Sequence, residues 1–79
     1  MDIHNLVSMA NQIGQFFSAY PDREEALEGI ANHIRKFWGP RMRLKLFECM
    51  DNGQTTELSE LVTQAVVQYR QTLNPVTKS

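Results

Sequence analysis

The stretch Phe37-Trp-Gly-Pro-Arg-Met-Arg43 divides the chain near its middle and decides how the segments on either side are arranged. Proline has no backbone N–H and a fixed φ, so Pro40 cannot continue a helix that reaches it, and it restricts the backbone of Gly39 as well. Proline is, however, favoured as the first residue of a helix. The stretch therefore predicts that one helix ends at about Trp38 and that another begins at Pro40, with Gly39 as its N-cap.

The segment before this stretch has the pattern of an amphipathic helix. Its apolar residues recur three or four positions apart, which is the helical period. Asp22 and Glu25 form a variant of the capping box at its start. Arg35 and Lys36 lie in its last turn, where the helix dipole favours cations. The pattern predicts a helix over about residues 22–38, with an apolar stripe of Leu27, Ile30, Ala31, Ile34, Phe37 and Trp38.

Another helical pattern follows Asp2, a favoured N-cap residue, and predicts a helix over about residues 3–20. Its apolar side chains cover about half of the helix circumference, which is more than one neighbouring helix requires. From Ile3 to Pro21 the segment contains no Asp, Glu, Lys or Arg. Charge depletion is typical of interface cores. The uncharged side therefore indicates either a contact with another protein or a solvated face that happens to use amides.

The segment after Pro40 fits two patterns. Met42, Leu44 and Leu46 alternate with basic residues, as in a strand. Met42, Leu46 and Met50 are spaced four apart, as in a helix. Because an isolated strand needs a partner and no other segment alternates, a helix over about residues 40–51 is the prediction.

The last helix is expected after a turn at Asp51-Asn-Gly-Gln54. Apolar residues from Leu58 to Leu73 recur at helical spacing, and Asn74-Pro75 stops the pattern. We expect a helix over about residues 56–73 and a frayed tail over 74–79. Together the patterns predict an all-α fold, in which residues 1–79 form a single small domain with a bundle of three to four helices.

Length and composition limit the function. The chain has 79 residues, a net charge of −1 and one cysteine, Cys49. One cysteine excludes an intrachain disulfide, and a lone thiol suits a reducing compartment. We expect neither a secretion signal nor a membrane span, because the N-terminus has no basic region and no apolar run approaches the roughly 18 residues that a span needs. We do not expect a complete enzyme with its own cofactor cleft at this size.

The sequence shows no constellation of catalytic or metal-ligating residues. His4, His33 and Cys49 have no ligand partners at helical spacing, so we expect no metal site. Cys49 also has no base near it in the sequence, and a buried helix cysteine is the better interpretation. The acidic residues of the 22–38 segment lie where the helix dipole favours them. The prediction is that the chain holds no catalytic, cofactor-binding or metal-binding residue.

The basic residues are concentrated around the central proline. Five of the eight lie within residues 35–45, with no acidic residue among them: Arg35, Lys36, Arg41, Arg43 and Lys45. With Phe37 and Trp38 in the same segment, three interpretations stay open. The segment could be a small helical nucleic-acid-binding module, a protein–protein hot spot, or a piece of core surrounded by solvated cations. A nucleic-acid module usually has an overall basic excess, which this chain lacks.

Three blocks of the sequence resemble one known family. They are Met9-Ala-Asn-Gln-Ile-Gly-Gln-Phe-Phe17, Pro21-Asp-Arg-Glu-Glu-Ala-Leu-Glu-Gly-Ile-Ala31 and Phe37-Trp-Gly-Pro-Arg-Met-Arg43. Together they are similar to the delta subunit of soluble NAD-dependent formate dehydrogenases that contain molybdenum or tungsten. The resemblance covers about residues 6–50 and, more loosely, the last helix. An acidic or amide residue often precedes the proline of the third block in the family, so Gly39 is expected to be a weaker cap.

The resemblance implies a non-catalytic accessory subunit of an oxidoreductase complex in the bacterial cytoplasm. The parent enzyme oxidises formate to carbon dioxide and reduces NAD⁺. Its alpha subunit is expected to hold bis-molybdopterin guanine dinucleotide and iron–sulfur clusters, and its beta and gamma subunits FMN and further clusters. The delta subunit is expected to carry no cofactor. It would dock on the catalytic alpha subunit and support assembly or stability of the cofactor-loaded complex.

The residues expected to make this contact come from the uncharged first helix and from the central stretch. Apolar side chains would anchor the contact, while Arg41 and Arg43 would pair with carboxylates of the partner or approach cofactor phosphates. The expected partner-binding residues are Asn11, Gln12, Gln15, Phe37, Trp38, Pro40, Arg41, Met42 and Arg43.

Overall fold

The computed structural model describes residues 2–75, in which the backbone forms five helices and no strand. In chain order they are α1 (Ile3–Phe17), α2 (Arg23–Phe37), α3 (Pro40–Asp51), α4 (Glu60–Gln68) and α5 (Arg70–Leu73). The predicted all-α fold is confirmed, and so is the choice of a helix for the ambiguous segment after Pro40. No helix within residues 2–75 is both long enough and apolar enough to cross a membrane.

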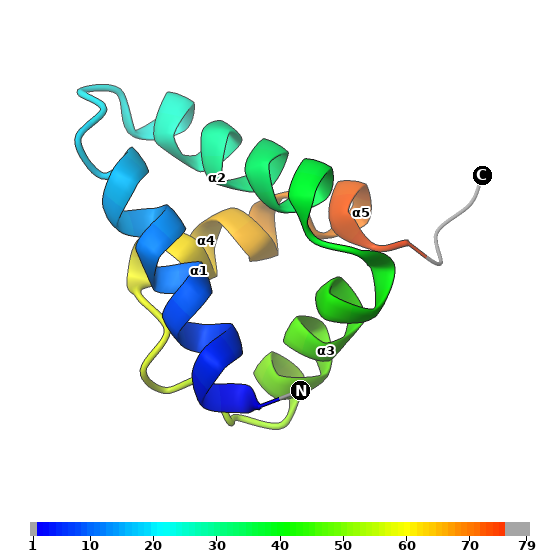
Figure 1. Cartoon of the computed structure of the whole chain (residues 1–79). Helices are drawn as coiled ribbons and strands as arrows, with labels where there is room; N and C mark the ends of the chain where they lie inside the picture. The colour runs from blue at the N-terminus through cyan, green and yellow to red at the C-terminus, as the bar shows by residue number, and fades with distance from the viewer. Residues whose placement is uncertain (1, 76–79) are drawn as a thin grey trace.

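Helices α1 and α2 form a hairpin joined by a turn at residues 18–22. Each helix begins at an aspartate whose carboxylate accepts a hydrogen bond from the backbone two residues later, at 3.2 Å for both Asp2 and Asp22. Figure 1 shows the two helices diverging from their turn, with α3 on the side where their far ends lie apart. The hairpin thus has a closed end at the turn and an open end near α3.

Helix α1 ends at Phe17, three residues before the predicted end at Tyr20. Pro21 disfavours helical backbone at the residue before it, so the helix cannot extend through Tyr20. The Tyr20 N–H instead donates to the Phe17 carbonyl at 3.0 Å, within the turn. Helix α2 starts and ends within one residue of its predicted bounds.

The break between α2 and α3 lies where Pro40 predicts it. Helix α2 ends just before Trp38, whose backbone is extended (φ −92°, ψ 128°), and Pro40 opens α3. Gly39 is the N-cap of α3 and supplies no side-chain hydrogen bond, as expected of a glycine at this position. Helix α3 ends at Asp51, as predicted, and Gly53 makes the following turn with φ +71°, a conformation that glycine adopts without strain.

The last helical segment begins later than predicted, so the expected start near residue 56 was wrong. The Leu58 N–H donates to the Thr55 carbonyl at 3.0 Å in a turn, and α4 starts only after Ser59. The Ser59 hydroxyl accepts a hydrogen bond from the Val62 N–H at 3.2 Å. A side-chain cap of this kind satisfies an N–H that has no partner within the helix, which fixes the helix start at residue 60.

The predicted helix over 56–73 is also interrupted near its end. Tyr69 has φ −108° and ψ 25°, outside regular helical geometry, and separates α4 from α5. Its N–H still donates to the Ala65 carbonyl at 3.0 Å, and its carbonyl accepts from Leu73 at 3.0 Å, so the break is a local distortion. Asn74 and Pro75 follow α5, and the rest of the predicted tail lies outside the described residues.

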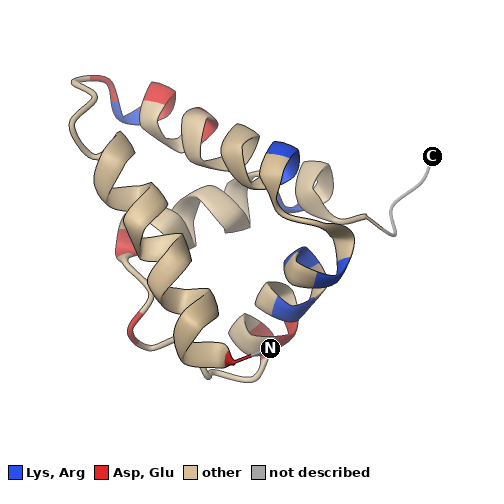
Figure 2. Cartoon of the chain, in the orientation of Figure 1, with Lys and Arg blue, Asp and Glu red and all other residues tan. Residues whose placement is uncertain are grey.

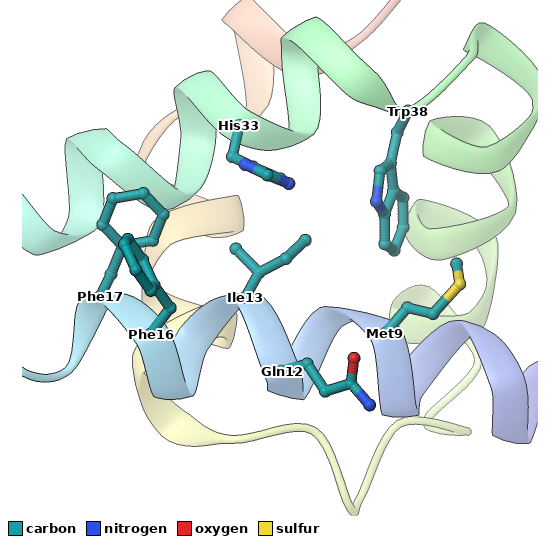
Figure 3. A pocket seen from close by; sticks show the side chains of 7 residues that line it. All are labelled: Met9, Gln12, Ile13, Phe16, Phe17, His33 and Trp38. Carbon is teal, nitrogen blue, oxygen red and sulfur yellow. The ribbon is translucent and has the colours of Figure 1, made fainter.

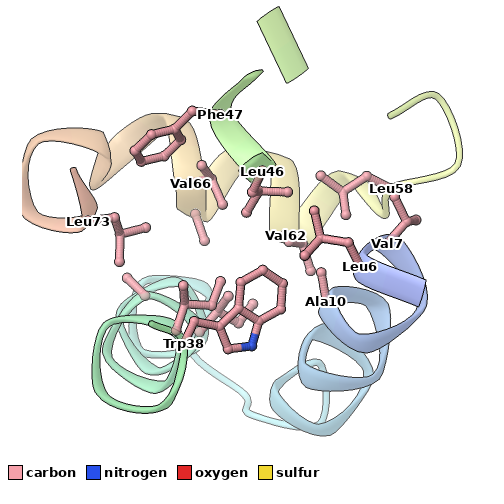
Figure 4. Close-up of a cluster of buried hydrophobic side chains, with 14 of the residues drawn as sticks. Leu6, Val7, Ala10, Trp38, Leu46, Phe47, Leu58, Val62, Val66 and Leu73 are labelled. Carbon is pink, nitrogen blue, oxygen red and sulfur yellow. The ribbon is translucent and has the colours of Figure 1, made fainter. Parts of the chain in front are cut away.

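The core lies between the α1–α2 hairpin and the other three helices, as Figure 4 shows. Helix α2 packs against α1, α4 and α5, while α1 also packs against α3 and α4. No polar residue within residues 2–75 is buried. The core cluster consists of Leu6, Val7, Ala10, Leu27, Ile30, Ala31, Ile34, Trp38, Leu46, Phe47, Leu58, Val62, Ala65, Val66 and Leu73.

Candidate docking site

A hollow of about 510 Å³ opens to solvent between α1 and α2. Figure 3 shows one wall formed by α1 and the other by α2 and the residue that follows it. We call this surface the α1–α2 groove. The residues that line it are Met9, Gln12, Ile13, Phe16, Phe17, His33 and Trp38.

Ring contacts run across this surface from the end of α1 to the end of α2. The Phe16 and Phe17 rings meet edge to face, with centroids 4.9 Å apart. The Phe17 ring lies 6.5 Å from the His33 ring. The His33 ring in turn lies 4.7 Å from that of Phe37. These four rings therefore connect the two walls of the groove.

Large apolar side chains remain exposed in the groove and beside it. Phe16 is 67% exposed, Phe37 is 68% exposed and Met9 is 39% exposed. A single exposed apolar residue is ordinary, but several gathered around one groove are typical of an interaction site. Figure 2 shows that α1 carries no charged residue, so this wall of the groove is uncharged along its whole length.

The charged residues near the groove lie at its two ends. Glu25 and Glu28 are exposed on the first turns of α2, close to the α1–α2 turn. Lys36 and Arg41 are exposed in the last turn of α2 and at the start of α3, on either side of Trp38. Figure 2 shows red on the first turns of α2 and blue on its last turn and on α3; the blue at the start of α2 is Arg23, which donates to the Gln64 side chain of α4. The groove therefore runs from an acidic end to a basic end.

The structure gives Asn11 a contact within the chain itself. Its side-chain nitrogen donates to the Glu57 carbonyl at 2.9 Å, and its side-chain oxygen accepts from the Ser59 N–H at 2.7 Å. Both bonds hold the segment before α4 against α1. The expected docking role of Asn11 stays a prediction beside this role in the fold. Gln12 lines the groove, and Gln15 is exposed on the same helix.

The expected anchors Phe37, Trp38 and Met42 differ in how far they are buried. Trp38 is 6% exposed and belongs to the core cluster, although it also lines the groove. Met42 is half-buried and packs against the same cluster. Phe37, the neighbour of Trp38, points away from the core and is exposed. A partner could therefore contact the Phe37 ring directly, whereas most of the Trp38 side chain is packed in the core.

The remaining residues of the predicted contact differ in exposure. Pro40 and Arg41 are exposed, whereas Arg43 is half-buried. The Arg43 Nε atom is buried and has no hydrogen-bond partner among the described residues. Base stacking beside these cations would need an exposed aromatic ring. Because Trp38 is in the core, Phe37 is left for that role.

Five of the residues that line the groove were not among the expected partner-binding residues: Met9, Ile13, Phe16, Phe17 and His33. A signal for four of them was present, since the apolar side chains of the first helix cover more of its circumference than one neighbour requires. The pattern did not show which of these side chains the core would leave exposed. That depends on where α2 crosses α1.

Cys49 is fully buried in α3, which confirms the prediction of a buried helix cysteine. Within residues 2–75, no three His, Cys, Asp or Glu side chains come together in a way that could hold a metal ion. Iron–sulfur clusters are held by several cysteine thiolates, and the sequence contains one cysteine. The residues of this chain therefore do not fit such a cluster.

A charged contact outside the groove ties α5 to α3. Arg70 Nη1 and Nη2 donate to the two carboxylate oxygens of Asp51 at 3.1 Å and 2.9 Å. The Arg70 guanidinium also lies over the Phe47 ring, with Cζ 4.5 Å from the ring centroid. The hydrogen bonds from Arg70 lower the pKa of the Asp51 carboxyl, and Asp51 raises the pKa of Arg70. This pair stabilises the fold and takes no part in the groove.

Comparison with known protein families identifies the chain. The family model described as the NADH-dependent formate dehydrogenase delta subunit, FdsD, matches residues 5–66, well over half of the chain. Comparison with curated proteins and with solved structures gave no match. The matched region includes α2, α3 and every residue that lines the groove. The chain therefore belongs to the delta-subunit family of NADH-dependent formate dehydrogenases, as the three blocks of sequence predicted.

Proposed function

We propose that this chain is a non-catalytic subunit that docks on the catalytic alpha subunit of a formate dehydrogenase through the α1–α2 groove. Membership of the delta-subunit family supports a place in that complex. The observation that carries the docking surface is the exposure of two rings, each about two-thirds exposed: Phe16 lines the α1 wall of the groove, and Phe37 lies beside the α2 wall, with its ring 4.7 Å from that of His33.

Burying these rings against a partner would stabilise the complex. Full burial of a large apolar side chain contributes about 1.5–3 kcal/mol. Aromatic anchors near the centre of an interface usually carry most of the binding energy. The α1 wall adds no charge that would have to be desolvated without a partner. The groove is therefore suited to a lasting, mostly apolar contact.

In this proposal the redox chemistry belongs to the other subunits. Those subunits would hold the bis-molybdopterin guanine dinucleotide with its molybdenum or tungsten, the iron–sulfur clusters and FMN. Formate oxidation and NAD⁺ reduction would take place there, in the bacterial cytoplasm. The single cysteine of this chain supports the division of roles, because a cluster needs several thiolates. The delta subunit would act by keeping the loaded complex assembled.

The experiment that tests docking is co-expression of the tagged chain with the other subunits of the formate dehydrogenase from the same source. The double variant Phe16→Ser with Phe37→Ser should no longer co-purify the alpha subunit. Formate-dependent NAD⁺ reduction should fall with the amount of assembled complex. Serine has a helix propensity close to that of phenylalanine, and both rings are exposed, so thermal unfolding of the chain alone should stay near that of the wild type.

Val67→Ser is the matched control for this variant. Val67 is 61% exposed on α4 and does not line the groove. The Val67→Ser variant should co-purify the alpha subunit in the same amount as the wild-type chain. If the folded double variant also retains the alpha subunit in wild-type amounts, the groove is not the docking site.

A further inference from the structure

We infer that the α1–α2 groove receives an amphipathic helix of the catalytic subunit, which lies antiparallel to α2 with its N-terminal turn over Lys36 and Arg41. The inference rests on the proposed docking function and adds the kind of segment that docks and its direction. It is carried by the length of the groove, by its preformed apolar floor and by the charge difference between its ends.

The groove has a length suited to two turns of a helix. In Figure 3, Met9 and Trp38 lie at one end, and Phe16 and Phe17 lie at the other. Seven positions separate Met9 from Phe16, which is about 10 Å along a helix. A helix bound in a groove presents apolar side chains at positions i, i+3 or i+4, and i+7. The occupant therefore needs three apolar anchors over about two turns.

The floor of the groove is fixed by the fold before a partner arrives. Trp38 belongs to the core cluster, and Ile13 and Phe17 pack against that cluster from its edge. Side chains that are already ordered lose little conformational entropy on binding. The exposed side chains that docking would have to order are Met9 and Phe16 on the α1 wall and Phe37 beside the α2 wall. A rigid helix is a suitable occupant for such a preformed surface.

The two ends of the groove differ in charge, and this gives the occupant a direction. Lys36 and Arg41 are exposed at the Trp38 end, and residues 35–47 include no acidic residue. Glu25 is exposed at the other end, in the first turn of α2. The α1 wall between the ends is uncharged (Figure 2). An occupant with carboxylates at one end and cations at the other is complementary in one direction only.

The helix dipole decides which end of the occupant is acidic. Acidic residues stabilise the first turn of a helix, and basic residues stabilise the last turn. A helix that follows this rule places its N-terminus over Lys36 and Arg41 and its C-terminus near Glu25. Helix α2 runs from the Glu25 end to the Lys36 end, so the occupant lies antiparallel to it.

The test uses the full-length chain and two designed peptides of about 14 residues, or roughly four helical turns. Both peptides carry the same three apolar anchors and no tryptophan. One has Glu in its first turn and Lys in its last turn, and the other has these charges exchanged. Trp38 is the single tryptophan of the chain and lines the groove, so its fluorescence reports occupancy. Titration calorimetry measures the same binding independently of the fluorophore.

The peptide with the acidic first turn should bind about tenfold more tightly, and this difference should shrink as salt rises. The exchanged peptide is also a poorer helix former, because its charges oppose the helix dipole, and poorer helicity alone would weaken its binding. A variant of the chain with reversed charges is therefore the control. In the variant Lys36→Glu with Arg41→Glu, the preference should reverse.

A matched pair of single variants separates the local contact from net charge. Lys36→Glu should reduce the preference, since Lys36 is three positions from His33 and lies on the neighbouring side of α2. Arg35→Glu makes the same change in charge one position earlier, on the side of α2 away from His33. It should leave the preference unchanged.

Several results would overturn the inference. Equal binding of both peptides, or the same preference in the charge-reversed variant, rejects the direction. If neither peptide binds while Phe16→Ser with Phe37→Ser still loses the alpha subunit, docking stands and the helical occupant is wrong. If that variant keeps the alpha subunit, the proposed docking function itself fails.

Two other occupants are also outcomes of the test. A stable homodimer that excludes both peptides places a second copy of the chain in the groove. Salt-sensitive binding of duplex DNA that requires Lys36 and Arg41, without a peptide preference, assigns the basic end to nucleic acid. Either result rejects the helix of the catalytic subunit.

Discussion

The ring of Phe17, at the end of α1, lies against the backbone of Gly29 in α2. A Cβ atom at position 29 would lie within 2.6 Å of Phe17 Cδ1, closer than side chains pack in proteins. Phe17 also contacts the rings of Tyr20 and His33. Glycine in a helix interior costs about 1 kcal/mol relative to alanine. Here it lets the two helices approach, and this contact sets one end of the groove.

Gly29→Ala should therefore destabilise the chain, although alanine is the better helix former. The propensity gain of about 1 kcal/mol is outweighed by an overpacking cost of about 1–3 kcal/mol. We expect a net loss of about 1 kcal/mol in the free energy of unfolding, measured by urea denaturation. In the Phe17→Ala background the same substitution should instead stabilise the chain. A stabilising effect of Gly29→Ala alone would mean that the ring moves aside at no cost.

Asn11→Ala should destabilise the chain by about 1–3 kcal/mol. The substitution removes both side-chain hydrogen bonds to the segment before α4 and leaves the Ser59 N–H, at 2.7 Å from Asn11 Oδ1, without its acceptor. Gln12→Ala on the same helix is the control, because Gln12 is exposed and should change stability by less than about 0.5 kcal/mol. Urea denaturation of both variants distinguishes them, and equal effects would contradict the role of Asn11 in holding the segment before α4 against α1.

Trp38→Ala should leave the isolated chain largely unfolded. Removal of a buried aromatic side chain costs about 3–5 kcal/mol, which is a large part of the roughly 5–15 kcal/mol that stabilises a whole domain. Trp38→Phe should cost clearly less, and far-ultraviolet circular dichroism measures both. A folded Trp38→Ala chain would show that the tryptophan is dispensable to the core. Because unfolding also abolishes assembly, Phe37 is the better position for testing docking.

Stability should fall at acid pH through the Asp51–Arg70 pair. Hydrogen bonds from Arg70 lower the pKa of Asp51 below its ordinary value of 3.8. The folded state then binds fewer protons than the unfolded state, so this stabilisation is present above the ordinary value and is lost as the pH falls through the lowered one. The effect should be small and should decrease with salt, since the pair is exposed.

Nuclear magnetic resonance titration of the Asp51 carboxyl measures this effect directly. In the Arg70→Gln variant the pKa of Asp51 should rise towards its ordinary value, because the guanidinium that stabilises the carboxylate is gone. An Asp51 pKa that does not move would contradict the proposed cause.

Helix boundaries set by adjacent residues could be predicted from the sequence. Pro40 predicted the break between α2 and α3, and the two N-cap aspartates predicted the starts of α1 and α2. The start of α4 was missed because several favoured N-cap residues, Thr55, Thr56 and Ser59, precede the apolar pattern, and the structure uses the last of them. Asn11 also accepts the Ser59 N–H across 48 positions of sequence, and no local pattern contains that contact.

The sequence by itself determined that the chain is all-α, that Cys49 is buried, that α1 is uncharged and to which family the chain belongs. The tertiary structure decided which apolar side chains are left for a partner. Phe16 is 67% exposed on α1. Phe37 is 68% exposed, although the next residue, Trp38, is buried. Adjacent residues of a helix point about 100° apart, and an apolar stripe that covers half of the circumference does not show which part the core will use. The crossing of α1 and α2 settles this, because it places one side of the stripe against the core and leaves the other facing solvent.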